Sequence, residues 1–521
     1  MNGAWRVCLI AASCLTPLFV PAHAAPLAAA DVTPIVERGF ARFGEPGLAG
    51  VVVQDDKVVW LGGLGVRKAG APEKVDVDTI FAVGSCAKSF ASALAARLVD
   101  EKRITWDDKV RKHLPWFTLY DPEVTRMVSL RDLLGMRTGL SSSEYSYRRS
   151  SPSREEQVRR MRYLKPAEEF RDAYIYSTDN YTALGLVEAT VAGQPWETLA
   201  RNELWRPLGM TRTNASAVET GKGDDFAWPH VRSGGVSTPI DLFYEDYAAL
   251  PAGGVNTSAR DLGVWLRFQL HEGVSAGRQL ISAAALEETH RPQMPERLRG
   301  GKDPLQWVLG GGEPLMTHAS YAMGWETHDY RGTRIITHSG AIDGFRCSMT
   351  LVPSAGLGLA FLTNSDDGFL TEAVSQAIVD RRLGLAGVDW IEAFARFAVR
   401  VEAQQKAEAE AHMPPKAPER PPSRPLADFT GAYVDVTSGY GAAVVKLADG
   451  RLTMTAGRMT YAFQPWAGDL FRVTENSPSG AYGQHPFFAR FKTGVQGAVD
   501  TIETTTGARF ERQAPAASGK P

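Results

Sequence analysis

The chain has 521 residues, too many for one compact core, and its composition of 44% hydrophobic and 22% charged residues is that of a globular protein. Its 57 basic and 59 acidic residues give a formal charge of −2 and are spread along the chain. These figures exclude a largely disordered chain, and without a basic field they argue against a nucleic-acid partner.

The first residues are typical of a secretory signal peptide. Arg6 precedes an apolar run at residues 7–20, and Pro21-Ala22-His23-Ala24 fits a small-x-small cleavage pattern. The run is short for a membrane span, although an uncleaved anchor is an alternative, as is a less favoured lipoprotein site at Cys14. We therefore expect removal of residues 1–24, a periplasmic or secreted mature protein, and no stable membrane insertion afterwards.

Cleavage would leave Cys86 and Cys347 as the two cysteines, and the ten histidines are scattered. This pattern is not a disulfide scaffold, and no C-x-x-C or H-E-x-x-H spacing indicates a zinc site. We expect no metal and no cofactor. Two buried free thiols are the default expectation, with a Cys86–Cys347 disulfide as the alternative in an oxidising compartment.

Helical and strand patterns follow one another along residues 25–411. In chain order, the expected elements are a helix at 35–42, a hairpin at 51–60, helices at 85–101, 181–192 and 258–271, strands at 333–337, 348–352 and 357–363, and helices at 371–383 and 390–411. The hairpin and the late strands bracket a mostly helical middle. This order predicts an α+β architecture in which both chain ends form one antiparallel sheet around an inserted helical domain.

A change of composition marks the C-terminal part. Six prolines at residues 414–425 predict a stiff linker, which we bound at 412–425. Short alternating runs follow at 431–435, 443–447, 452–455, 487–492 and 499–504. They predict a small all-β barrel at 426–515, after a hydrolase-like domain at 25–411.

Two clusters carry side chains suited to nucleophilic catalysis. Ser85 and Lys88 lie one helical turn apart, so both side chains emerge on the same face, where a lysine can assist removal of the serine proton. Tyr176 lies at a helix entrance and could act as a base beside a cation. Each residue taken alone also fits a structural role: a helix cap, a solvated lysine or a core aromatic.

The third cluster is the run His338-Ser339-Gly340-Ala341, which follows an apolar strand. A glycine there lets a substrate backbone lie close along the strand. The N–H groups of Ala341 and Ser85 could form an oxyanion hole. A single histidine such as His338 more often has a structural role than a catalytic one.

In this order the three clusters resemble the motifs of the serine penicillin-recognising family, which includes class C-like β-lactamases, D-alanyl-D-alanine peptidases and related esterases. The likeness covers about residues 32–383, and the segment 426–515 resembles the small lipocalin-like appendage of some members. The resemblance implies the β-lactamase/transpeptidase-like fold. It also implies that Ser85 is the acylated nucleophile, Lys88 its proton partner, Tyr176 the general base and acid, and residues 338–341 the substrate strand. The segments that extend the likeness beyond the motifs are 99–115, 128–140, 204–210, 252–255 and 321–325.

Two positions depart from the family pattern. Thr178 stands where many members have asparagine, so it lacks an amide donor for a substrate carbonyl. His338 stands where potent antibiotic hydrolases have lysine, and a histidine is only partly charged at neutral pH. Both changes favour a peptidase or esterase over a dedicated β-lactamase. Arg346 could supply the missing charge, although a plain surface role is the simpler interpretation.

The sequence therefore predicts an exported, metal-free serine hydrolase that cleaves an amide or ester bond of a small-molecule or peptide substrate. A true β-lactamase and a non-catalytic penicillin- or peptide-binding protein stay alternatives, and the oligomeric state stays open. A rival G-x-S-x-G nucleophile pattern occurs at residues 273–277. We interpret it as a loop, because it follows a helix and no Ser…Asp…His order is evident.

Overall fold

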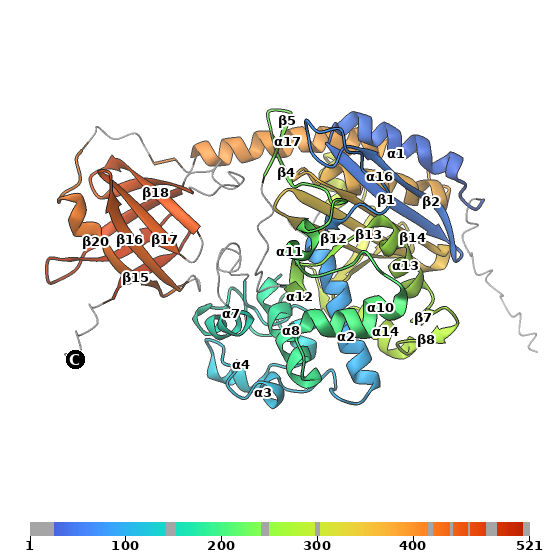
Figure 1. The fold of residues 1–521 in the computed structure, drawn as a ribbon, viewed down its shortest axis with the longest axis horizontal. Coiled ribbons are helices and arrows are strands. Elements are labelled where there is room, and N and C mark those ends of the chain that lie inside the picture. Colours follow the sequence, from blue (N-terminus) through green and yellow to red (C-terminus); the bar gives the residue numbers. More distant parts are fainter. Residues whose placement is uncertain are drawn as a thin grey trace, which may run out of the picture.

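The computed structural model describes residues 25–141, 153–240, 250–296, 303–411, 413–414, 420–437, 441–456, 459–475 and 487–513. These residues form an eight-stranded antiparallel sheet with helices, followed by a closed eight-stranded barrel (Figure 1). The expected signal peptide at 1–24 and residues 412 and 415–419 of the expected linker lie outside the described residues. Within the described part, no helix is long and apolar enough to cross a membrane.

In the main sheet, strands from the start of residues 25–411 pair with strands from near the end of that range, as the sequence predicts. The hairpin pairs β1 (Gly47–Gln54) with β2 (Lys57–Gly65), and the other edge of β1 pairs with β14 (Leu357–Thr363). Beyond β14 the order continues with β13 (Phe345–Val352), β12 (Thr333–Ile342), β11 (Glu326–Tyr330), β10 (Met316–Tyr321) and β9 (Met294–Pro295). The expected α+β fold is confirmed.

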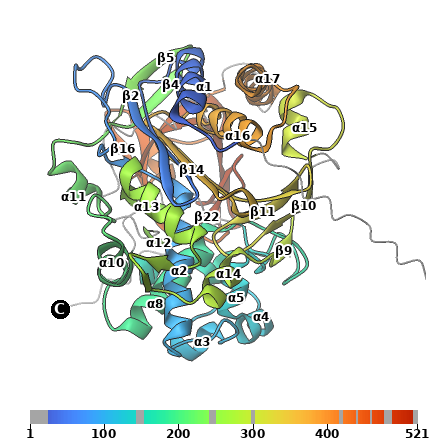
Figure 2. The ribbon, with the colours of Figure 1, turned by 90° about the vertical axis from the view of Figure 1, so that its right-hand side faces the viewer.

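Helices cover both faces of this sheet (Figure 2). One face packs against α1 (Ala29–Phe43), α16 (Phe369–Leu383) and α17 (Trp390–Ala411), and the other against α2 (Ala87–Asp100) and α13 (Ala259–Leu270). Side chains of β1 alternate between the two cores: Leu48 and Val52 join the first, Val51 and Val53 the second. Because β1 is buried on both faces, its sequence is a continuous apolar run rather than an alternating one.

The middle of the chain forms the predicted helical region. Its longest helix, α8 (Thr178–Ala192), ends at Gly193, whose φ of +70° makes it a left-handed cap. Ser258 caps α13 by accepting the Asp261 N–H. The shorter helices are α3 (Val110–His113), α4 (Pro122–Met127), α5 (Leu130–Leu134), α7 (Arg154–Arg160), α9 (Trp196–Ala200), α10 (Arg206–Leu208), α11 (Ala217–Gly221), α12 (Leu250–Gly253), α14 (Ala283–His290) and α15 (Pro304–Leu309).

Two predicted boundaries are wrong near the candidate site. Residues 84–86 form a single 3-10 turn, η1, before α2 begins at Ala87, so the predicted helix at 85–101 starts too early. The strand predicted at 333–337 continues as β12 to Ile342, because residues 336–342 pair with β13.

The G-x-S-x-G segment forms a small hairpin of β7 (Val274–Ser275) and β8 (Arg278–Gln279), not a strand-to-helix elbow.

The expected β barrel is also confirmed. Its strands are β15 (Gly431–Asp435), β16 (Ala442–Ala448), β17 (Arg451–Ala456), β18 (Met459–Ala467), β19 (Leu470–Glu475), β20 (Phe487–Thr493), β21 (Val499–Thr504) and β22 (Arg509–Arg512). The sequence patterns did not predict β18, β19 and β22. Pairing of β15 with β22 closes the barrel, and clustered aromatic rings such as Phe429 and Phe491, 4.9 Å apart, give it a core of its own.

Candidate active site

Residues 84–88, which we call the nucleophile turn, bring Ser85 and Lys88 together as the sequence predicts. The short strand β3 (Phe81–Ala82) leads into η1, and α2 follows, so both side chains lie within one turn. The Lys88 side chain is completely buried, with its Nζ 3.1 Å from Ser85 Oγ and 2.8 Å from the carbonyl oxygen of Ala252. A lysine nitrogen at this distance can exchange a proton directly with the serine hydroxyl.

Tyr176 approaches this pair from another segment, just before α8. The centre of its ring lies 4.7 Å from Lys88 Nζ, and the ring of Tyr181 lies 5.6 Å from the same atom. Two aromatic faces at these distances attract an ammonium group. The structure therefore joins two of the predicted clusters around the lysine nitrogen.

The third cluster lies on β12, whose backbone runs directly beside the nucleophile turn. A Cβ on Gly340 would lie 1.9 Å from the Val83 carbonyl oxygen, and one on Gly84 would lie 2.7 Å from the Ala341 nitrogen. Only glycine at both positions permits this approach, and Gly84 also has a φ of +53°. The Ala341 nitrogen thus lies beside the turn that carries Ser85.

His338 lies on β12 in a surrounding that keeps it neutral. Its side chain is 2% exposed, and burial, with a contribution from the Lys88 charge, lowers its pKa to about 3. Its Nδ1 lies 2.6 Å from the Ser339 carbonyl oxygen, which fixes the proton on Nδ1 and leaves Nε2 to accept from the Tyr321 hydroxyl at 3.4 Å. The expectation of a partly charged histidine is therefore wrong, because burial removes the charge.

The remaining candidates from the sequence lie around the same strand or at the start of α8. Thr178 is the first residue of α8 and is buried, whereas the side chains of Ser339 and Ala341 are exposed. Arg346 lies opposite Ala341 on β13, but its Nη1 donates to the carbonyl oxygens of residues 342 and 345. These two bonds fix the arginine at the end of the β12–β13 hairpin.

Tyr321, which is buried, links the site and was not predicted from the sequence. Its ring stacks on Tyr174 at 5.2 Å and contacts Tyr176 and His338 edge-on at 6.3 and 6.1 Å. The only signal was its place in the family-like segment 321–325. Nothing local in the sequence shows that β10 would carry this ring to the other two clusters.

Cys86 and Cys347 are free and buried, as the default expectation had it, and Cys86 Sγ lies 3.3 Å from the His338 carbonyl oxygen. Among the described residues, no group of three or more His, Cys, Asp or Glu side chains could hold a metal ion.

Comparisons with known proteins agree with this architecture. The family model described as Beta-lactamase matches residues 34–380, and that of a domain of unknown function, DUF3471, matches residues 415–519. The unguisins hydrolase ungD of Aspergillus violaceofuscus is 27% identical over 472 residues, covering 82% of this chain and 80% of the relative. Protein flp of Staphylococcus aureus is 25% identical over 352 residues, 66% of this chain and 64% of the relative.

Solved structures share the fold. The octameric penicillin-binding protein homologue from Pyrococcus abyssi superposes with a TM-score of 0.59 at 18% identity, covering 93% of this chain and all of that one. A D-stereospecific amidohydrolase from Streptomyces sp. gives a TM-score of 0.53 at 21% identity, covering 69% of this chain and all of that one. Since the family model matches well over half of its residues, this chain belongs to the beta-lactamase family and is a hydrolase of the β-lactamase fold.

Proposed function

We propose that the protein is an exported serine hydrolase that cleaves an amide or ester bond through an acyl-enzyme on Ser85. The observation that carries the proposal is the 3.1 Å contact between Lys88 Nζ and Ser85 Oγ, made by a lysine with no exposed surface. A serine hydroxyl becomes an effective nucleophile when a neighbouring group takes its proton. The 27% identical relative, named an unguisins hydrolase, supports hydrolysis as the type of reaction.

In the proposed reaction, Ser85 Oγ attacks the substrate carbonyl carbon and gives its proton to the Lys88–Tyr176 pair. The N–H groups of Ser85 and Ala341 stabilise the oxyanion that forms. Collapse of this intermediate breaks the amide or ester bond, and the same pair returns the proton to the leaving amine or alcohol. A water molecule then gives a proton to the pair, and its oxygen attacks the acyl carbon. The bond from this carbon to Ser85 Oγ breaks, the acid is released, and the pair returns the proton to Oγ.

The neutral His338 bears on the choice of substrate. With a pKa of about 3, its imidazole gives no positive charge at pH 7 to hold a substrate carboxylate. This supports amides or esters that are uncharged next to the scissile bond over β-lactam antibiotics, which carry a carboxylate. A small ester or a D-amino-acid peptide without a free carboxylate at that position fits the site best.

Mass spectrometry of the purified protein after incubation with a p-nitrophenyl ester, and separately with a penicillin, tests the proposal. We expect a transient adduct on the Ser85 peptide with continuous release of nitrophenol, and neither in Ser85→Ala. An active Ser85→Ala variant would refute the proposal. A permanent adduct without turnover would favour the binding-protein alternative, and rapid hydrolysis of a chromogenic cephalosporin would favour a true β-lactamase.

Export is the second part of the proposal. Removal of residues 1–24 would leave Ala25 as the first residue of a periplasmic or secreted protein. The intact mass of the protein recovered from the periplasm or medium tests this. A mature protein that retains residues 1–24, or that stays in the cytoplasmic fraction, would contradict it.

A further inference from the structure

Tyr176 lies in a stretch that has neither helix nor strand to fix it. We call residues 166–177 the Tyr176 segment, and residues 135–140, which follow α5, the α5 turn. The segment binds to the turn through its backbone, and four of its N–H groups donate to carbonyl oxygens of the turn. These are Ala167 and Glu168 to Gly139 at 2.8 and 3.3 Å, Arg171 to Arg137 at 2.9 Å, and Ile175 to Met136 at 3.3 Å. The position of Tyr176 therefore depends on the contact between two loops.

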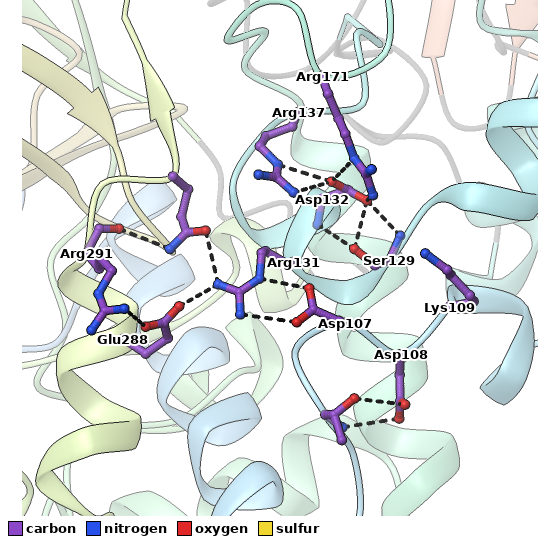
Figure 3. A network of polar contacts seen from close by, with 12 residues as sticks. Asp107, Asp108, Lys109, Ser129, Arg131, Asp132, Arg137, Arg171, Glu288 and Arg291 are labelled. Carbon is purple, nitrogen blue, oxygen red and sulfur yellow. Dashed lines mark hydrogen bonds and ion pairs between the residues drawn. The ribbon is translucent and has the colours of Figure 1, made fainter.

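The side chain of Asp132, on α5, joins these two loops (Figure 3). Its carboxylate is fully buried and accepts from Arg171 twice, with Nε 2.9 Å from Oδ1 and Nη2 2.7 Å from Oδ2. Arg137, in the α5 turn, donates to the same carboxylate from Nη2 at 2.5 Å. The N–H and hydroxyl of Ser129 complete the set at 2.9 and 2.7 Å. One carboxylate thus holds an arginine from each loop.

One residue in each of the two loops has a left-handed backbone conformation, which residues with a Cβ disfavour. Met136 has a φ of +56° and Arg171 a φ of +65°, both in the left-handed region. Such residues persist where the surrounding contacts fix them. For Arg171, the two-point bond to Asp132 adds to its backbone bond to Arg137, and a planar guanidinium on a carboxylate defines both distance and orientation.

Asp132 is charged in the folded protein. Burial raises its pKa, but the hydrogen bonds from Arg171, Ser129 and Arg137 outweigh burial and bring the pKa below its ordinary value. At neutral pH a carboxylate therefore faces two guanidinium groups, and the link between the loops is ionic as well as hydrogen-bonded.

We propose that Asp132 and Arg171 are positioning residues that hold Tyr176 against Lys88. The inference rests on the proposed function, in which Tyr176 takes part in proton transfer. Tyr176 lies five residues after Arg171, and its ring must stay 4.7 Å from Lys88 Nζ to serve that step. A displacement of about 1 Å in such a group lowers the rate about 10²-fold.

Arg171 is the better residue to change, because its side chain is 43% exposed and its loss leaves no buried cavity. Arg171→Asn removes the guanidinium and keeps a residue type that tolerates positive φ. We expect kcat to fall about 10- to 100-fold with KM within about twofold of the wild-type value. Arg171→Lys, which restores one charge without the two-point geometry, should recover part of kcat.

Arg131→Gln is the matched control. Arg131 lies next to Asp132 on α5 and binds Asp107 and Glu288 in a separate set of contacts (Figure 3). Among the described residues, no hydrogen bond or ion pair joins its side chain to the Tyr176 segment. It should lower Tm without a comparable loss of kcat. If Arg171→Asn kept the wild-type kcat and lost only as much Tm as Arg131→Gln, the positioning role would be refuted.

Two further measurements separate this inference from the proposed function. Tyr176→Phe tests the function: if it is fully active, Tyr176 has no role in catalysis. Hydrogen exchange at the N–H of Ile175, which donates to Met136, tests positioning without any assay of activity. Arg171→Asn should accelerate that exchange and Arg131→Gln should not, and equal exchange in the two variants would overturn the positioning role.

Discussion

Gly340→Ala would test whether β12 must touch the nucleophile turn. The added Cβ would lie 1.9 Å from the Val83 carbonyl oxygen and 3.1 Å from the Cys86 nitrogen. Both are backbone atoms, so no flexible side chain can move away. Real Cβ contacts do not come closer than about 3.0 Å, so the strand and the turn must separate by about 1 Å or more.

This separation acts on the proposed oxyanion hole, because Ala341 follows Gly340 and Ser85 lies on the displaced turn. Loss of one well-placed oxyanion donor lowers kcat about 10²- to 10³-fold, or about 2.7–4 kcal/mol in activation free energy. A 1 Å misplacement of the reacting groups gives a similar loss of about 10²-fold. We therefore expect Gly340→Ala to reduce kcat about 10²-fold while the fold persists.

Initial rates of p-nitrophenyl ester hydrolysis, with Tm from thermal unfolding, provide the assay. Gly358→Ala is the matched control: it lies on β14 of the same sheet, and the three atoms nearest to the added Cβ would be side-chain atoms, at 3.0 to 3.2 Å. It measures the general effect of an extra methyl group in a strand. A Gly340→Ala enzyme with the kcat of the wild type would show that the close approach of β12 is not needed for catalysis.

Three further predictions follow from buried groups. Burial raises the pKa of Glu188 well above 4.5 despite its hydrogen bond from Trp196, so the folded protein keeps a proton that the unfolded chain loses as the pH rises through 4.5. The free energy of unfolding should therefore fall above that pH, and Glu188→Gln should make this fall smaller between pH 5 and 8, as measured by urea unfolding. The same pH dependence of the free energy of unfolding in both proteins would contradict this. Lys88→Met should lower kcat about 10²- to 10⁴-fold with little change in Tm, measured with the same ester, and an active variant would exclude a proton-transfer role for the lysine. Cys86 and Cys347 are fully buried, and burial raises the pKa of Cys86, so a thiol reagent should titrate both only after denaturant is added; fast reaction in the folded protein would contradict the packing.

Local sequence patterns predicted most of the α+β fold. The strand at 357–363 and the helix at 390–411 coincide with β14 and α17, because a continuous apolar run and a long amphipathic repeat are properties of consecutive residues. By contrast, β10 and β11 were missed. Their polar residues at 317–318 and 328–329 hide the alternation, and they become strands through pairing with β12 and β9.

The sequence by itself determined which chemical groups are available: the Ser85–Lys88 spacing, Tyr176, and the run from His338 to Ala341, in an order that resembles one family. Only the tertiary structure decided the state of those groups. The charge of His338 depends on its burial and on Lys88, which lies 250 residues away in the chain. The link from Asp132 to the Tyr176 segment likewise depends on two loops meeting. Burial, electric field and contact are set by neighbours in space, and no local window of sequence contains them.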